Sequence, residues 1–403
     1  MPTDPTVVAT AHGTPPLVSQ PPPAVDPLAA LPALARSLPD AGRRVTLAPH
    51  AGSADAVALA QLAEAVVGQK RTLAIVCADS LSAQRLTEEI AAFAPARRLA
   101  FFPDWETLPY DPISPHEDLV SERLATLFRL ARNDCDVILL AASTAMQRLA
   151  PASYLAAHTF FLKQGERFNV DRFREQMTLA GYTHVTQVVS PGEFSVRGGL
   201  IDLFPMGSAL PYRLDLFDDE IETIRTFDVD TQRTLYPVRE VRLLPAREFP
   251  LDENGRARFR SRFREVFEGD PSKSPLYKDV SNGIVPGGIE YYLPLFFEQT
   301  ANFADYLPRD AIVAVHGDVG AAIDRFWQDT ESRFRLLRGD KARPLLPPDA
   351  LFSPPDDFRR QLKAFGRVEV PTVDASAALP PMHPRGACPR CRSIAAPTIR
   401  WQR

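Results

Sequence analysis

Residues 49–56 are where the sequence comes closest to nucleotide chemistry. They lie between a predicted strand and a predicted helix, the position of a phosphate-binding loop in an α/β sheet. Such a loop needs the pattern GxxxxGK[ST], because glycine amides surround the phosphates, lysine neutralises their charge and the hydroxyl holds magnesium. Gly52 and Ser53 remain here. Asp55, however, stands where lysine is required and Ala56 replaces the hydroxyl, so we expect no ATP binding at this turn.

Other residue types that carry catalysis form no recognisable constellation. None of the seven histidines occurs in an HExxH motif, and there is no GxSxG nucleophile elbow. The acidic run at residues 218–220 joins two predicted strands, and we interpret it as a hairpin turn because aspartate is common in turns. Cys388 and Cys391 supply half of a zinc site and His383 adds at most one ligand, whereas a structural site needs four. The sequence therefore predicts no catalytic residue and no metal.

Alternating strands and helices are predicted in the first part of the chain. Strands are expected at residues 44–49, 71–78, 98–103 and 136–143, of which the last three are expected to be buried. Helical patterns separate them, and this βαβα order is typical of a doubly wound, mostly parallel sheet.

The alternation breaks near residue 158. Strand-like runs, among them residues 185–190 and 194–204, then follow one another with little helix between them. This pattern is typical of antiparallel pairing, so we predict an α+β insertion. A buried strand predicted at residues 311–317 indicates that the α/β pattern resumes after it.

These changes of pattern divide the chain into predicted segments. They are a disordered leader (1–26), the first part of the α/β core (27–157), the insertion (158–244), the second part of the core (245–345), the start of an incomplete further domain (346–374) and an atypical tail (375–403).

Composition restricts the class of protein. The chain has 403 residues, a formal net charge of −4 and a pI near 6.0, so the charge of the whole molecule does not favour a broad grip on DNA phosphates. No apolar run reaches the roughly 18 residues that a membrane span needs. Four cysteines fit a reducing compartment, and we expect a cytoplasmic protein.

The remaining candidate chemistry is surface recognition. Alternation along the predicted strand at residues 212–217 places Arg213 and Phe217 on the face opposite to the core. Arginine and aromatic residues are enriched at binding hot spots. Arg197 lies on a neighbouring run and precedes two glycines that could mark a bulge or a bare patch of backbone. Alternatively, Arg197 pairs with Asp215 on a solvated face and the glycines merely bend the strand.

Three long segments resemble a known family. Residues 104–127, 192–234 and 288–297 are similar to the UvrB-homology module of the bacterial transcription-repair coupling factor (Mfd) family. The resemblance runs from about residue 28 to about residue 370. It implies a RecA-like α/β core, like the first domain of the excision protein UvrB, interrupted by a smaller domain that binds UvrA.

The resemblance also assigns residues. It implies that Arg197, Arg213 and Phe217 fall on family positions that contact UvrA. Thr183 stands where other members or UvrB carry a basic residue, which would make the contact set smaller. The family's module has lost the ATP site of UvrB, and residues 110–118 leave no room for the β-hairpin with which UvrB grips damaged DNA.

Full-length members of this family bind RNA polymerase and translocate along double-stranded DNA with a motor that hydrolyses ATP and uses magnesium. The resemblance includes none of those segments. We therefore expect a non-hydrolytic fragment, without a cofactor, that binds UvrA and so recruits nucleotide excision repair to stalled polymerase. The alternative is a UvrB-like or helicase-like protein that binds damaged DNA or hydrolyses ATP in its own right.

Overall fold

The computed structural model describes residues 37–49 and 52–372, and a six-stranded parallel sheet organises the larger part of them. The strand order is β1-β14-β13-β2-β4-β3, with every neighbouring pair parallel. The strands are β1 (Arg44–Thr46), β2 (Leu73–Cys77), β3 (Leu99–Phe102), β4 (Val137–Ala141), β13 (Ile312–His316) and β14 (Gly366–Val370). The predicted leader and the tail after residue 375 lie outside the described residues.

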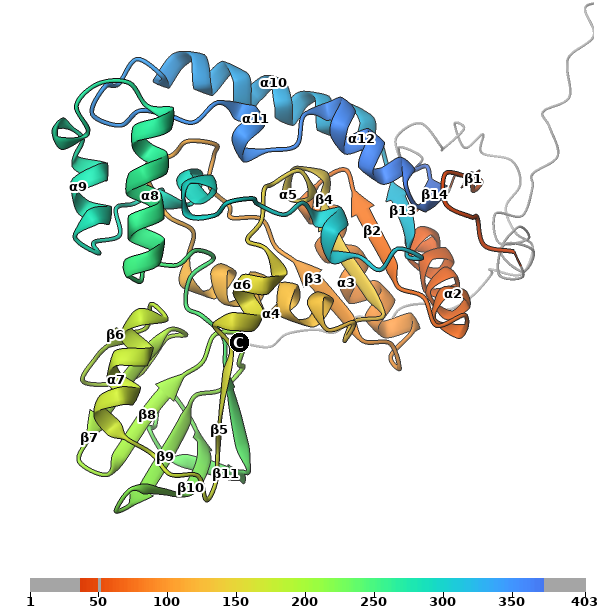
Figure 1. Ribbon diagram of the computed structural model, residues 1–403. Helices are drawn as coiled ribbons and strands as arrows, with labels where there is room; N and C mark the ends of the chain where they lie inside the picture. The colour runs from red at the N-terminus through yellow and green to blue at the C-terminus, as the bar shows by residue number, and fades with distance from the viewer. Residues whose placement is uncertain (1–36, 50–51, 373–403) are drawn as a thin grey trace, which may run out of the picture.

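Helices cover both faces of this sheet (Figure 1). Alternate residues of β2 enter two different hydrophobic clusters: Leu73 and Ile75 pack with α2 and α3, whereas Ala74 and Val76 join the cluster that includes α4. A strand buried on both faces is continuously apolar, as β2 is. The covering helices are α2 (Ala54–Gly68), α3 (Ser80–Phe93), α4 (Glu117–Ala131), α5 (Ala142–Ala145) and α10 (Val319–Leu337).

A second six-stranded sheet forms the insertion, in the order β11-β10-β9-β8-β7-β6. Its pairs are antiparallel except β6 with β7. The helix α7 (Val170–Leu179) packs on one face, where the Phe173 ring lies 5.9 Å from that of Phe194. The strands are β6 (Thr183–His184), β7 (Glu193–Arg197), β8 (Leu200–Phe204), β9 (Tyr212–Phe217), β10 (Glu220–Phe227) and β11 (Thr234–Val238).

A two-stranded antiparallel ribbon carries the chain into and out of the insertion. It consists of β5 (Phe160–Lys163) and β12 (Glu240–Leu243). In Figure 1 the insertion lies below the core, and this ribbon connects the two. Its second attachment is to α4, where the Gly207 amide donates to Ser121 Oγ at 2.7 Å. A Cβ at Gly207 would lie 2.8 Å from Ala125 Cβ, so only glycine allows this close approach.

The remaining elements are short helices around the core. The aromatic run at residues 288–297 forms the 3₁₀ helix η2 rather than a strand or an α-helix. The others are α6 (Ala152–Ala157), α8 (Glu253–Val266), η1 (Pro271–Lys273), α9 (Pro275–Ser281), η2 (Ile289–Phe296), η3 (Phe303–Tyr306), α11 (Pro348–Leu351) and α12 (Pro355–Lys363). No helix within the described ranges is long and apolar enough to cross a membrane.

The predicted fold class, a mostly parallel RecA-like α/β core interrupted by a smaller α+β unit, is confirmed. The prediction that residues 346–374 begin a separate domain is wrong. The strand β14 lies between β1 and β13 and completes the core sheet. The strand predicted at residues 185–190 is also wrong, because β6 ends at His184 and the loop after it buries Val188 instead. The other segment boundaries stay predictions.

Candidate protein-binding surface

The three residues predicted to contact a partner lie on one face of the insertion sheet. This is the face opposite to the one on which α7 packs. The structure brings Arg197 and Arg213 onto a single carboxylate, that of Asp202 on the strand between them. We call the surface formed by Arg197, Asp202, Arg213 and Phe217 the arginine face.

Arg213 is largely committed to interactions within the insertion. Its Nε and Nη2 atoms donate to the Asp202 carboxylate at 2.7 and 2.9 Å, and Nη1 donates to the Gln232 carbonyl at 3.0 Å. The guanidinium also lies 4.8 Å from the centre of the Phe227 ring. Hydrogen bonding to Asp202 raises the pKa of Arg213. Because its side chain is only 15% exposed, little of Arg213 is accessible to a partner.

Arg197 is much more accessible. Its Nη2 donates to Asp202 Oδ2, yet half of its side chain is exposed. The predicted pairing of Arg197 with Asp215 is wrong. Asp202, on the strand β8 between β7 and β9, is the acid that both arginines reach, and Asp215 instead accepts a hydrogen bond from Thr223 at 2.8 Å. The arginine face is thus organised around one carboxylate that the sequence analysis did not identify.

The two glycines after Arg197 form the turn of a hairpin. Arg197 pairs with Leu200 in the register of β7 and β8, so Gly198 and Gly199 connect the two strands. Gly198 has a φ of +62°, and a Cβ at Gly199 would lie 3.2 Å from the Leu216 carbonyl oxygen. The prediction of a bulge or bend within one strand is therefore wrong. Glycine is needed at both positions for a tight turn against β9.

Phe217 is the apolar residue of the arginine face, and 68% of its surface is accessible. It ends β9 beside the two-residue turn Asp218–Asp219, in which Asp218 has a φ of 52°. The hairpin turn predicted from the acidic run is confirmed. The ring borders a hollow of about 340 Å³ that Glu220 and Arg239 also line. A single exposed apolar residue is common on protein surfaces. Aromatic residues and arginine are, however, enriched at protein interfaces, so Phe217 on the same face as Arg197 is a candidate contact residue.

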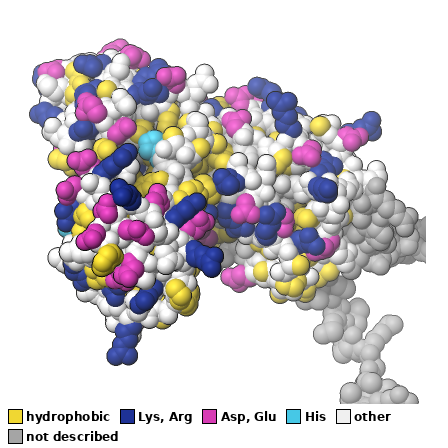
Figure 2. All heavy atoms as spheres, turned by 60° about the horizontal axis from the view of Figure 1, so that its bottom comes forward, with side chains coloured by type: hydrophobic (Ala, Val, Ile, Leu, Met, Phe, Trp, Pro, Cys, Tyr) yellow, Lys and Arg dark blue, Asp and Glu magenta, His cyan; other side chains and the backbone are white. Residues whose placement is uncertain are grey.

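Figure 2 shows that the charged side chains on one face of the molecule are mixed. Arginine and lysine alternate with aspartate and glutamate there, and no broad patch of one sign is visible. The face seen in Figure 2 therefore does not carry the continuous basic stripe that a phosphate backbone would need.

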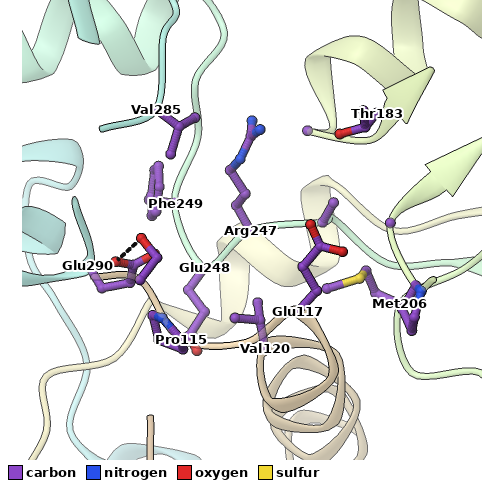
Figure 3. Close-up of a pocket in the computed structure, with 15 residues that line it drawn as sticks. Pro115, Glu117, Val120, Thr183, Met206, Arg247, Glu248, Phe249, Val285 and Glu290 are labelled. Atoms are coloured by element: carbon purple, nitrogen blue, oxygen red, sulfur yellow. Dashed lines mark hydrogen bonds between the residues drawn. The ribbon is translucent and has the colours of Figure 1, made fainter. Parts of the chain in front are cut away.

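A separate cavity of about 210 Å³ lies at the joint between the insertion and the core (Figure 3). Glu290 is buried there and accepts a hydrogen bond from Ser114 at 2.9 Å. Burial raises the pKa of Glu290 to about 7. Arg247 extends into the same cavity, and burial lowers its pKa. Thr183, the departure from the family pattern, lines this cavity and is not part of the arginine face.

The described residues of the turn predicted to be a degenerate phosphate loop are bound to side chains of α3 and β13. Ser53 Oγ donates to Glu89 at 3.1 Å, and Ala56 is fully buried. Asp55 is 3% exposed and pairs with Arg85 and His316. Gly52 has a φ of +57° and a Cβ there would meet no atom within 4 Å.

Sequence reasoning found Asp55 but missed both of its partners. Arg85 lies on α3 and His316 is the last residue of β13, far from Asp55 along the chain. The carboxyl ends of parallel strands meet at one edge of a sheet, and that rule could have pointed to His316.

Comparison with known proteins distinguishes the insertion from the core, as the structure does. The family model described as the UvrB interaction domain matches residues 160–249, which include the ribbon and the whole arginine face. A transcription-repair-coupling factor of Haemophilus influenzae is 44% identical over 318 residues, covering 78% of this chain and 27% of that protein. Over the region that it spans, the chain is a relative of the transcription-repair-coupling factors.

Two further transcription-repair-coupling factors are similar to the chain over the same region. The transcription-repair-coupling factor of Escherichia coli is 43% identical over 333 residues, covering 82% of this chain and 29% of its own length. That of Myxococcus xanthus is 30% identical over 364 residues, covering 85% of this chain and 30% of its own. The chain therefore spans less than a third of the length of these transcription-repair-coupling factors.

Proposed function

We propose that the insertion of this transcription-repair-coupling factor relative binds UvrA through the arginine face. The observation that carries the proposal is an exposed Phe217 on the same face as a half-exposed Arg197 whose position is fixed by buried Asp202. An aromatic ring and a guanidinium held in place by its neighbours lose little conformational freedom when a partner binds.

The partner chemistry follows from these groups. Phe217 would enter an apolar pocket of UvrA, and Arg197 would pair with an acidic side chain beside that pocket. Arg213 would contribute mainly by holding Asp202, since most of its donors are already used inside the insertion. In this account the module has no cofactor and performs no hydrolysis.

The wider role is also a proposal. In a protein that also carries the polymerase-binding and motor segments, this module would recruit UvrA, and with it nucleotide excision repair, to a stalled RNA polymerase. The similarity to transcription-repair-coupling factors supports that role. The mixed charge on the face in Figure 2 does not support binding of damaged DNA. The pairing of Asp55 with Arg85 and His316 does not support ATP hydrolysis at the predicted phosphate turn.

A capture experiment with purified UvrA tests the proposal through the arginines. Arg197→Ala should reduce capture of UvrA by about tenfold, which corresponds to about 1.4 kcal/mol. The matched control is Arg172→Ala, because Arg172 is also an exposed arginine but lies on α7, on the opposite face of the sheet. Equal capture by the Arg197 variant and the control, with unchanged thermal melting, would refute the assignment.

A further inference from the structure

A buried cluster of charged side chains occupies the place where this fold would hold a nucleotide phosphate. Asp55 lies in the first turn of α2, the helix that follows β1 along the chain, and His316 ends β13. The carboxyl edge of a parallel sheet, together with the N-terminus of the following helix, is where α/β folds bind phosphate. We propose that the carboxylate of Asp55 is a built-in anion, which occupies this phosphate position permanently and excludes an external oxyanion from it.

The contacts of Asp55 are those that an oxyanion makes. Its Oδ2 atom lies 2.6 Å from Arg85 Nη2 and 2.8 Å from His316 Nε2. Its Oδ1 atom accepts from Arg85 Nη1 at 3.2 Å and from the Ala56 amide at 2.6 Å. A guanidinium, an imidazole and an amide at a helix N-terminus are together a typical donor set for phosphate.

The cluster is enclosed. The side chains of Asp55 and His316 are 4% and 2% exposed, while Arg85 closes the outer side and is held by Glu89 at 2.8 Å. Burial alone would raise the pKa of Asp55, but hydrogen bonds from His316 and Arg85 outweigh burial and hold the pKa well below its usual range. The carboxylate is therefore ionised at neutral pH and ties α2, α3 and β13 together.

The pairing of Asp55 would exclude phosphate more completely than the absence of the lysine alone. A turn that merely lacked lysine would leave the other phosphate donors free. Here those donors are already paired with a negative charge of the chain itself, so occupancy and repulsion both exclude phosphate. Removing the Asp55 side chain leaves the donors in place, and the vacated site should then accept inorganic phosphate.

Thermal melting of the whole chain in sodium phosphate and in sodium chloride of equal ionic strength, at pH 7.5, tests this inference. Asp55→Ala should melt several degrees below the wild type in chloride, and phosphate should restore much of that loss in a saturable manner. The wild type should show only the gradual, non-saturable stabilisation that phosphate, a salt excluded from protein surfaces, gives to folded chains in general. The double variant Asp55→Ala/Arg85→Ala should lack the saturable recovery, because a main donor is gone.

Asp55→Asn supplies a second comparison, since its amide still fills the space. It should be less stable than the wild type and gain no more from phosphate than the wild type does. If Asp55→Ala does not fold in chloride, its refolding yield in phosphate and in chloride replaces the melting curve, with a higher yield expected in phosphate. The inference is overturned if Asp55→Ala gains no more from phosphate than the wild type does, or if its saturable response survives the loss of Arg85.

Discussion

Asp202 is the residue on which the arginine face depends. It is 1% exposed and accepts hydrogen bonds from arginines on both neighbouring strands. A buried carboxylate that is paired in two directions fixes the geometry of both cations, and its loss leaves a guanidinium without its charge partner. Arg197 is then free to sample other rotamers, whereas Arg213 keeps the Phe227 ring and the Gln232 carbonyl.

Asp202→Asn should therefore lower the free energy of unfolding by about 2 kcal/mol, because breaking a buried pair costs more than the pair contributes. Urea denaturation of the whole chain measures this change. Asp215→Asn is the matched control on the same face, since Asp215 accepts from Thr223 and is only half-buried. A loss for Asp202→Asn no larger than that of the control would contradict the central place given to Asp202.

At this scale the sequence predicted correctly which face of β9 carries Arg213 and Phe217, and it predicted the pairing of Arg197 wrongly. Alternation along β9 is enough to separate Arg213 and Phe217 from the buried Leu214. The partner of Arg197 depends on which strand lies between β7 and β9, and on the hairpin turn at Gly198, and neither can be deduced from alternation. A single short-range pattern does not determine strand register.

The attachment of the insertion to the core is the main feature at the scale of elements. The ribbon of β5 and β12 carries the chain across, and α4 meets the insertion through Gly207 and Ser121. The cavity at this joint holds Glu290, a carboxyl group that is 8% exposed. Since Glu290 is buried only while the insertion and the core are packed together, its protonation is coupled to that packing.

The pH dependence of stability has a definite sign here. The pKa of Glu290 is about 7 in the folded chain against an ordinary value of 4.5, because burial disfavours its charged form. Between these values the folded state binds more protons than the unfolded state, so stability falls as pH rises. The penalty is absent below pH 4.5 and complete above pH 7, and amounts to about 3 kcal/mol at most.

Glu290→Gln removes this titration while keeping an acceptor for Ser114. The variant should gain stability relative to the wild type at pH 8 and little at pH 5, as measured by urea denaturation at both pH values. Glu298→Gln is the control, since Glu298 is 81% exposed and forms a surface ion pair with Arg258. A difference between Glu290→Gln and the wild type that does not change with pH would contradict the account.

Most of the elements were predictable from the sequence, but the strand at residues 185–190 and the place of β14 were predicted wrongly. Continuous apolar runs predicted the buried strands β2 and β4. The strand β14 was assigned to another domain because the proline-rich residues 343–357 precede it and look like a boundary. In the structure it completes the sheet, since parallel pairing joins strands that are far apart in sequence and leaves no local signal.

At the scale of the whole molecule, the described residues form an α/β core and an insertion that carries the proposed binding surface. Within residues 37–49 and 52–372, no group of histidine, cysteine and acidic side chains is arranged to hold a metal ion. In the core, Asp55 is paired with Arg85 and His316, and in the insertion, Asp202 is paired with Arg197 and Arg213. The chain spans less than a third of its relatives, so its role within a longer protein stays a proposal.

Titration of purified UvrA with the wild-type chain and with Phe217→Ala tests this account most directly. Phe217 packs little inside the insertion, so its truncation should leave thermal melting unchanged and weaken UvrA binding by about 2 kcal/mol, or about thirtyfold. Leu179→Ala is the matched control, because Leu179 is 56% exposed but lies on α7, across the sheet. We predict that the control binds like the wild type and Phe217→Ala does not; equal affinity of all three for UvrA would contradict the central claim.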